Sequence, residues 1–366
     1  MDDLEIQKGF FFRICNQNEI ERIFNVQNAK DYLLKIRAET IVDHMRLYRV
    51  YRNKALIDEK NWSLENSFDN SHYKVFVKNL AKHYQQRGEA ITYGNIFSND
   101  PNGCVFNTVY CPIITISDSL TFFFKFMNLA LMDFGERVPE YICINALRIA
   151  IRVMLQTEAL DFFMDPRGIV PEDIGETIHL SIPYQMQFIA GHEFAHYLLE
   201  HLSESSTSDK PIFHAIFPND QEYKPMKVYT KSQKQEFEAD IYSIKLPNYN
   251  TDEKKEILEA ALVWFGSLDL YESVVRAINP PNPYGYHTHP SARDRYENLL
   301  SNIPMPSGSE IENWKYFLKT IDHYKEILLE DVFKNIELYE TYGSVYLDKP
   351  NSEWRGPELR DRIDYY

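Results

Sequence analysis

The residues best suited to chemistry form one short run, HEFAH at positions 192–196, inside a segment with a helical hydrophobic pattern. On a helix, His192 and His196 lie one turn apart, roughly 6 Å along the axis, on the same face. Two neutral imidazoles placed in this way can bind one zinc ion. Glu193 lies about 100° further round the helix, where it can accept a proton from water activated by the ion. The spacing therefore predicts a hydrolytic zinc site.

A catalytic zinc site needs a third protein ligand, and the acidic segment 235–240 (QEFEAD) is the best source. We expect Glu236 to be that ligand, with Glu238 as the alternative. Glu236 and Asp240 are four residues apart and share a helix face. Asp240 is therefore expected to accept the second N–H of a ligand histidine and so fix its tautomer.

Other side chains are weaker ligand candidates. A metzincin-type site would need Gly at 199 and His at 202, but both positions hold leucine, so we do not expect His201 to bind the metal. Cys104 or Cys111 could bind the zinc as an inhibitory thiolate, although buried, inert thiols are the more common case. The chain has only four cysteines and no C-x-x-C pair, which argues against a disulfide framework or a sulfur-rich zinc site.

A third segment, 286–295 (YHTHPSARDR), lies where a loop is expected to enter a helix, with Pro290 at the first helical position. His289 or Arg295 could there stabilise the oxyanion that forms when a peptide carbonyl is attacked. The alternative is a capped surface helix with exposed histidines.

In this order the three segments resemble the gluzincin metallopeptidases, with HExxH at 192–196, ExxxD at 236–240 and HPxxxxR at 289–295. The arrangement is similar to that of the HtpX and CAAX prenyl protease group, and it covers roughly residues 140–300. The resemblance implies a zincin-like core with one zinc ion. It also implies a role for each matched residue: zinc ligands His192, His196 and Glu236, general base Glu193, and substrate or transition-state contacts from His289 and Arg295.

Many members of that group are embedded in membranes, and their soluble relatives are commonly exported. The N-terminal sequence here is acidic and has only a short apolar core, unlike a secretory signal, and no apolar run is long enough to span a membrane. We therefore expect a cytoplasmic protein. A soluble protein with this core is similar to the family of the phage-exclusion peptidase Lit, known for cutting a translation elongation factor. That similarity implies a triggered peptidase acting in phage defence.

The elements that position these residues are expected to be mainly helical, because glycine is scarce and long segments repeat apolar residues at helical spacing. The predicted fold class is α+β, mainly α, with a small sheet. Helices are expected over 20–51, 73–86, 139–163, 184–202 (entered through Pro183), 232–245, 253–278 and 313–339. Short strands are expected at 10–14, 114–116, 213–217 and 227–230, with loops at 203–211 and 279–288 and a loose tail after 343.

Three parts are predicted: residues 1–100, a mixed region that could act as a sensor or bind substrate; 101–305, the metallopeptidase core; and 306–366, a helix with a charged tail. The formal net charge of −15 argues against a nucleic-acid binder, whose affinity comes from neutralising phosphates.

We expect a zinc-dependent endopeptidase that acts on a protein or peptide substrate. Two alternatives fit the same residues. A zinc-stabilised binding or scaffold protein would need the ligands but not Glu193. A hydrolase of a non-peptide amide would differ only in the shape of its pocket.

Overall fold

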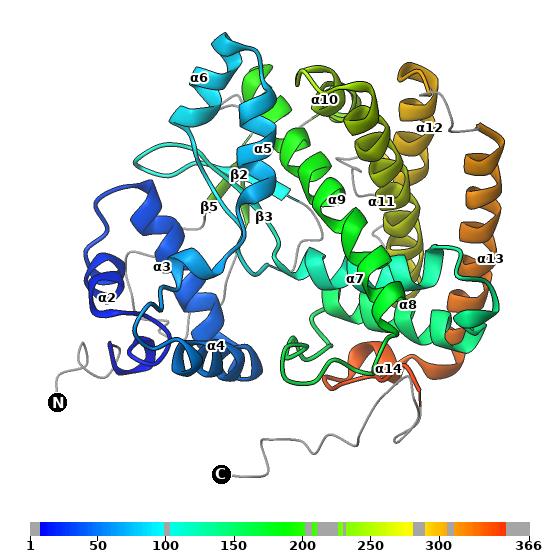
Figure 1. Ribbon diagram of the computed structural model, residues 1–366, viewed down its shortest axis with the longest axis horizontal. Coiled ribbons are helices and arrows are strands. Elements are labelled where there is room, and N and C mark those ends of the chain that lie inside the picture. Colours follow the sequence, from blue (N-terminus) through cyan, green and yellow to red (C-terminus); the bar gives the residue numbers. More distant parts are fainter. Residues whose placement is uncertain are drawn as a thin grey trace.

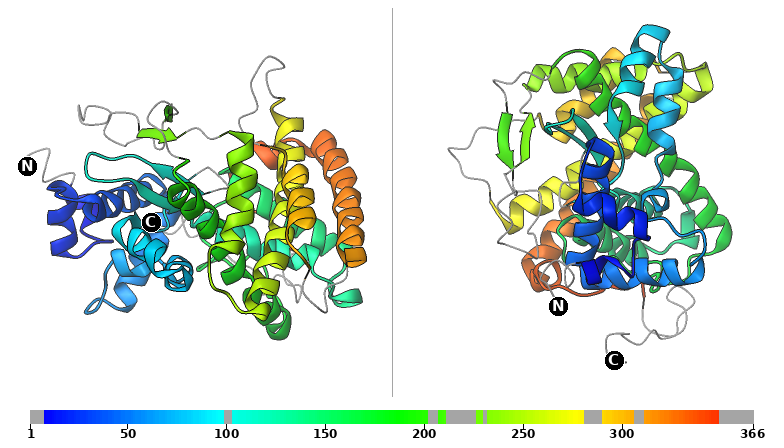
Figure 2. Two further views of the ribbon diagram at one scale, coloured as in Figure 1. Left: turned by 90° about the horizontal axis from the view of Figure 1, so that it is seen from above. Right: turned by 90° about the vertical axis from the view of Figure 1, so that its left-hand side faces the viewer.

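The computed structural model describes residues 8–98, 103–201, 207–210, 226–229, 232–280, 290–305 and 311–348. The protein is mainly helical with one small sheet, which confirms the predicted class (Figure 1). A group of N-terminal helices lies on one side of the sheet and a larger group of C-terminal helices on the other, and the view from above shows the same division (Figure 2).

The first two N-terminal helices named below begin at side-chain caps, as their sequence favours. Asn16 and Glu19 form a capping box, and Asn28 accepts hydrogen bonds from two N–H groups of the next helix. The strand expected at 10–14 is wrong, because residues 8–11 are helical. Phe11 and Ile14 are buried while Phe10 and Phe12 are exposed, a spacing of three that suits a helical turn. The helices are α2 (Gln17–Phe24), α3 (Ala29–Asp43), α4 (Met45–Ile57), α5 (Ser71–Asn79) and α6 (Lys82–Ala90).

The sheet has the order β1-β3-β2-β5-β4, with β1 parallel to β3 and the other pairs antiparallel. The strands expected at 114–116 and 227–230 are confirmed within a residue or two, whereas 207–210, expected as loop, is a strand. The strand expected at 213–217 lies outside the described residues. β1 and β3 lie on either side of the domain boundary predicted at residue 100. The strands are β1 (Thr92–Tyr93), β2 (Gly103–Phe106), β3 (Ile113–Ile116), β4 (Thr207–Lys210) and β5 (Met226–Tyr229).

The two faces of the sheet have different partners. Phe106 and Ile113 pack with Leu33 of α3 in a small separate core. Val105 and Ile114 belong to the main core, which includes the long central helix α9 (Glu172–Leu198). Because successive strand residues point to opposite faces, the side of β2 that carries position 103 faces α9.

Helix α9 is longer than predicted, because it begins at Glu172 rather than near 184 and contains Pro183 in its interior. An interior proline removes a helical hydrogen bond and costs about 3 kcal/mol. Tertiary packing offsets this cost: Ile182 is buried, and the buried amides of Gln185 and Asn128 donate hydrogen bonds to each other at 2.9 and 3.0 Å.

The remaining helices are α7 (Ser119–Leu131), α8 (Glu140–Met154), α10 (Gln233–Lys245), α11 (Thr251–Ile278), α12 (Ala292–Asn302), α13 (Ile311–Asn335) and α14 (Glu337–Glu340). Of these helices, α7, α10 and α11 pack against α9, while α8 packs on α7 and both α12 and α13 pack on α11 (Figure 1). The helix expected over 139–163 ends at Met154, because Gln156 adopts a left-handed conformation (φ 59°). Pro290 precedes the N-cap Ser291 and so lies outside the helix it was expected to begin.

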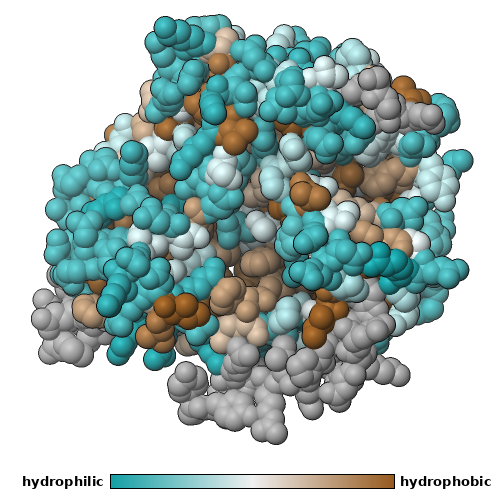
Figure 3. All heavy atoms as spheres, in the orientation of Figure 1, coloured by the Kyte–Doolittle hydropathy of each residue, from teal (hydrophilic) through white to brown (hydrophobic). Residues whose placement is uncertain are grey.

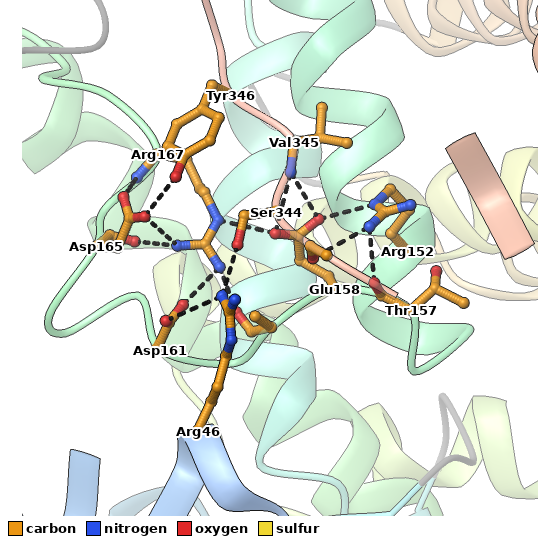
Figure 4. Close-up of polar contacts among 12 residues, drawn as sticks. Arg46, Arg152, Thr157, Glu158, Asp161, Asp165, Arg167, Ser344, Val345 and Tyr346 are labelled. Atoms are coloured by element: carbon orange, nitrogen blue, oxygen red, sulfur yellow. Dashed lines mark hydrogen bonds and ion pairs between the residues drawn. The ribbon is translucent and has the colours of Figure 1, made fainter. Parts of the chain in front are cut away.

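Residues 344–348, expected to belong to a loose tail, are bound to the body of the protein by a buried ionic group (Figure 4). Glu158 accepts hydrogen bonds from Arg167 Nε and Arg152 Nε, both at 2.8 Å, and from the backbone N–H of Val345. Leu347 is fully buried. We call Arg152, Glu158, Asp161, Asp165 and Arg167 the Glu158 cluster. Hydrogen bonds from its backbone to the buried ionic group thus hold a segment that has no helical or strand pattern of its own.

In the described part of the chain, no helix is both long enough and apolar enough to cross a membrane. The face shown in Figure 3 is mainly hydrophilic, with apolar side chains in separate spots.

Candidate metal centre

Helix α9 places His192, Glu193 and His196 in the interior of the protein, each 6% exposed or less. The Nε2 atoms of the two histidines lie 3.1 Å apart, so both rings point at the same spot. This is the arrangement that the i, i+4 spacing predicts.

Glu236 of α10 completes the group. Its Oε2 lies 3.4 Å from His192 Nε2, and its Oε1 lies 3.4 Å from His196 Nε2. A tetrahedral zinc ion with bonds of ~2.0–2.1 Å separates its ligand atoms by about 3.3–3.4 Å. The donor types and their spacing therefore fit zinc without rearrangement. Among the described residues, these three are the only His, Cys, Asp or Glu side chains that converge in this way.

The close approach of α10 to α9 depends on Gly191. A Cβ at this position would lie 2.7 Å from the ring of Phe76 and 3.1 Å from Cβ of Ser243 on α10. Three residues further along α9, the ring of Phe194 stacks on the same Phe76 ring, with the two ring centroids 5.2 Å apart. A small residue beside the first histidine thus lets α5 and α10 both approach the part of α9 that carries the site.

His192 is held from behind by an ion pair. Its Nδ1 lies 2.9 Å from Asp240 Oδ1, so Nδ1–H donates to the carboxylate and the lone pair of Nε2 faces the metal position. Arg295 of α12 binds both oxygens of Asp240, at 2.8 and 2.5 Å, and its Nη1 lies 3.9 Å from Glu236 Oε2. The geometry expected of Asp240 is thus present. Arg295 lies beneath the ligands, where it balances the charge of two carboxylates.

The carboxylates around His192 and Arg295 favour the charged forms of these two residues despite their burial. Burial lowers the pKa of His192, but its hydrogen bonds to Asp240 and Glu236 outweigh this, so the pKa of His192 is raised. The pKa of Arg295 is also raised, because the attraction of Asp240 outweighs burial. The guanidinium additionally lies 4.7 Å above the ring of Phe265.

The other zinc-facing histidine has a different support, which the sequence analysis did not anticipate. His196 Nδ1 lies 3.0 Å from Nδ1 of His201, and His201 Nε2 lies 3.4 Å from Glu238 Oε2. His201 is therefore a neighbour of a ligand, in agreement with the expectation that it does not itself bind the metal. Glu238, the alternative third ligand, contacts His201 instead of joining the convergent group.

Glu193 lies directly beside the metal position, with Oε1 3.8 Å from His192 Nε2. Strand β2 packs against it at Gly103: a Cβ there would lie 2.5 Å from Glu193 Cγ. Gly103 is not among the predicted site residues, because an Asn-Gly pair at the end of a Pro-containing run is typical of a loop. No local signal links it to a residue ninety positions away.

Two further predictions have different outcomes. Cys104 points away from Glu193, since it is adjacent to Gly103 on β2, and it packs together with Cys111 on the α3 side of the sheet. This is opposite to the face where a metal thiolate would have to lie, so the inhibitory-thiolate hypothesis is wrong.

His289 lies outside the described residues, and the contacts of His289 and Arg295 with substrate stay predictions.

Comparison of the chain with protein-family models, with curated proteins and with solved structures finds no significant match. The geometry of the site and the resemblance of its motifs are therefore the basis for a functional proposal.

Proposed function

We propose that this protein is a zinc-dependent peptidase of the gluzincin type, with a zincin-like core. The observation that carries the proposal is the convergence of His192 Nε2, His196 Nε2 and a Glu236 oxygen at 3.1–3.4 Å, with the carboxylate of Glu193 beside them. When bound, zinc supplies a lowered pKa for water and polarises a carbonyl oxygen.

Glu193 is suited to the role of general base. It takes a proton from the attacking water and then delivers it to the departing amine. Gly103 keeps the backbone of β2 against the Glu193 side chain and so limits the positions that its carboxylate can take. Asp240 holds His192 with its lone pair toward the metal, and Arg295 holds Asp240.

A peptide substrate is what the resemblance to the gluzincin metallopeptidases implies. Strand β2, which begins beside the proposed base, is an interior strand between β3 and β5. The physiological substrate, the phage-defence trigger and the cytoplasmic location stay predictions from the sequence.

The test compares wild type with Glu193→Gln, which keeps the shape of the side chain but removes the base. We expect the variant to bind one zinc per chain and to lose about 10²–10⁴-fold in hydrolysis rate. Zinc content is measured by elemental analysis, and cleavage by profiling new N-termini in a cell extract.

Three outcomes would contradict the proposal. Wild type without stoichiometric zinc would exclude the metal centre. Undiminished proteolysis by the variant would exclude the base. Zinc binding without hydrolysis of any peptide would favour the scaffold or non-peptide alternatives.

A further inference from the structure

The end of helix α9 has an unusual geometry that brings His201 back onto a metal ligand. The N–H of His201 donates to the carbonyl of His196 at 3.0 Å, and the N–H of Glu200 donates to the carbonyl of Tyr197 at 3.3 Å. These two hydrogen bonds define a Schellman motif, which requires a left-handed residue between helix and exit.

That left-handed residue is Glu200, with φ 61°. The conformation is sterically unfavourable for a residue with a Cβ, and glycine is the common choice. Arg87 of α6 supports the turn by donating hydrogen bonds to the carbonyls of Tyr197 and Leu198. The helix thus ends in a reinforced turn that folds the next residue toward the interior, where His201 is 8% exposed.

The resulting contacts form a chain from the metal position toward the surface. His201 Nε2 faces the carboxylate of Glu238, which favours a proton on that nitrogen and leaves a lone pair on Nδ1. His201 Nδ1 then accepts a hydrogen bond from His196 Nδ1–H at 3.0 Å. With its proton on Nδ1, His196 presents the lone pair of Nε2 to the metal position.

We propose that His201 is a positioning residue that fixes the tautomer and ring orientation of the ligand His196, with Glu238 orienting His201 in turn. This inference rests on the zinc site of the proposed function. His201 does for His196 what Asp240 does for His192, but with a neutral ring in place of a carboxylate.

The test measures zinc affinity of the full chain by competition with a chromophoric chelator. His201→Leu fills a similar volume without an acceptor, and we expect it to weaken zinc binding about 10–100-fold, as loss of a ligand's hydrogen-bond partner usually does. His201→Asn offers Oδ1 near the place of Nδ1 and should stay within about threefold of wild type. The visible absorption of the cobalt-substituted protein should change in the Leu variant and resemble wild type in the Asn variant.

A matched control is His323→Leu. His323 also contacts a glutamate, Glu140, at 3.2 Å, but both side chains are exposed and far from the ligands in the fold. Its loss should leave zinc affinity unchanged. Should His201→Leu fail to fold, Glu238→Ala provides the second measurement, since its side chain is 41% exposed. It should weaken zinc binding by a factor of about three.

The outcomes separate the two proposals. Wild type without zinc affinity would refute the metal centre itself. Wild type that binds zinc, with His201→Leu equally tight or with the Leu and Asn variants equally impaired, would overturn the role of His201 and leave the metal centre standing. If only Glu238→Ala can be measured, unchanged affinity would overturn the proposed chain of contacts.

Discussion

The metal centre and the Glu158 cluster are both buried and both built from ionisable side chains, but they differ in which kinds of groups contact one another. In the Glu158 cluster every contact joins a donor to an acceptor: Glu158 meets two guanidinium groups, and Arg167 also meets Asp161 at 2.6 Å (Figure 4). In the metal centre two imidazole nitrogens and a carboxylate meet one another at 3.1–3.4 Å. Two imidazole Nε2 atoms and a carboxylate at this spacing form the donor set of a zinc ion, whereas the Glu158 cluster pairs its carboxylates with guanidinium groups of the chain itself.

The comparison teaches how to distinguish a functional cluster from a structural one. Buried ionic groups are costly unless each finds an opposite partner. A cluster that is complete within the chain contributes to the architecture, here by holding residues 343–347 against the body of the protein. A cluster that gathers two imidazole nitrogens and a carboxylate around one point has the donor set of a metal site.

The largest effect on stability is expected at the Glu158 cluster. Glu158→Ala leaves two buried guanidinium groups without their shared carboxylate, and we expect a loss of about 3–5 kcal/mol in the free energy of unfolding. Urea denaturation measures this loss, and zinc affinity of the folded fraction should not change. A loss below about 1 kcal/mol would mean that the cluster is not the structural anchor described here.

The next effect is expected on the rate of hydrolysis, through the proposed general base Glu193, rather than on stability. Gly103→Ala places a Cβ 2.5 Å from Glu193 Cγ, so the carboxylate must move. We expect hydrolysis to fall about 10–100-fold while zinc content stays at one per chain, because a shift of about 1 Å in a catalytic group costs that much. Gly175→Ala in α9 is the control, since a Cβ there meets nothing within 4 Å. Equal activities of the two variants would contradict the role of Gly103.

A third buried group, the imidazole of His72, is favoured by the fold in its neutral form. His72 Nε2–H donates to Asn95 Oδ1 at 3.0 Å, and burial lowers the pKa of His72 to about 4. Since the unfolded chain titrates near pH 6.5, it binds more protons than the folded protein between pH 6.5 and 4, so acidification destabilises the fold.

Lowering the pH of metal-free protein from 7 to 5 should therefore cost wild type about 1–2 kcal/mol more in unfolding free energy than it costs His72→Gln. Denaturant unfolding at the two pH values measures the difference. Parallel pH profiles for the two proteins would show that His72 is not kept neutral by the fold.

The smallest effect on stability is expected at Glu236 of the metal centre. Glu236→Gln in metal-free protein keeps the shape of the side chain, and Arg295 retains its closer partner, the carboxylate of Asp240. We expect a change of less than about 1 kcal/mol in unfolding free energy, together with a large loss of zinc affinity. A loss as great as that of Glu158→Ala would show that Glu236 is held by structural pairing, and the contrast between the two clusters would fail.

Most of the helices were predictable, because their apolar periodicity and their caps are local properties of the chain. The helix α7 was not expected, and the helices expected over 20–51 and 73–86 are each interrupted. The ends of the helices were not predictable. The apolar pattern that begins after Pro139 continues beyond Met154, but the helix ends there because Gln156 turns the chain. Pro183 lies inside a helix that it was expected to begin. Such boundaries depend on packing partners that are distant in the sequence, which periodicity does not contain.

The order of residues is enough to define the chemistry of one helix turn, because the geometry of an α-helix requires His192 and His196 to share a face, and Glu236 and Asp240 likewise. The contacts that complete this turn come from packing between distant elements. Gly103 reaches Glu193 through the sheet, Arg295 reaches Asp240 across a helix contact, and His201 returns to His196 because Glu200 adopts a left-handed turn. Each of these contacts depends on where a helix ends or on which elements pack together, and no local periodicity encodes either.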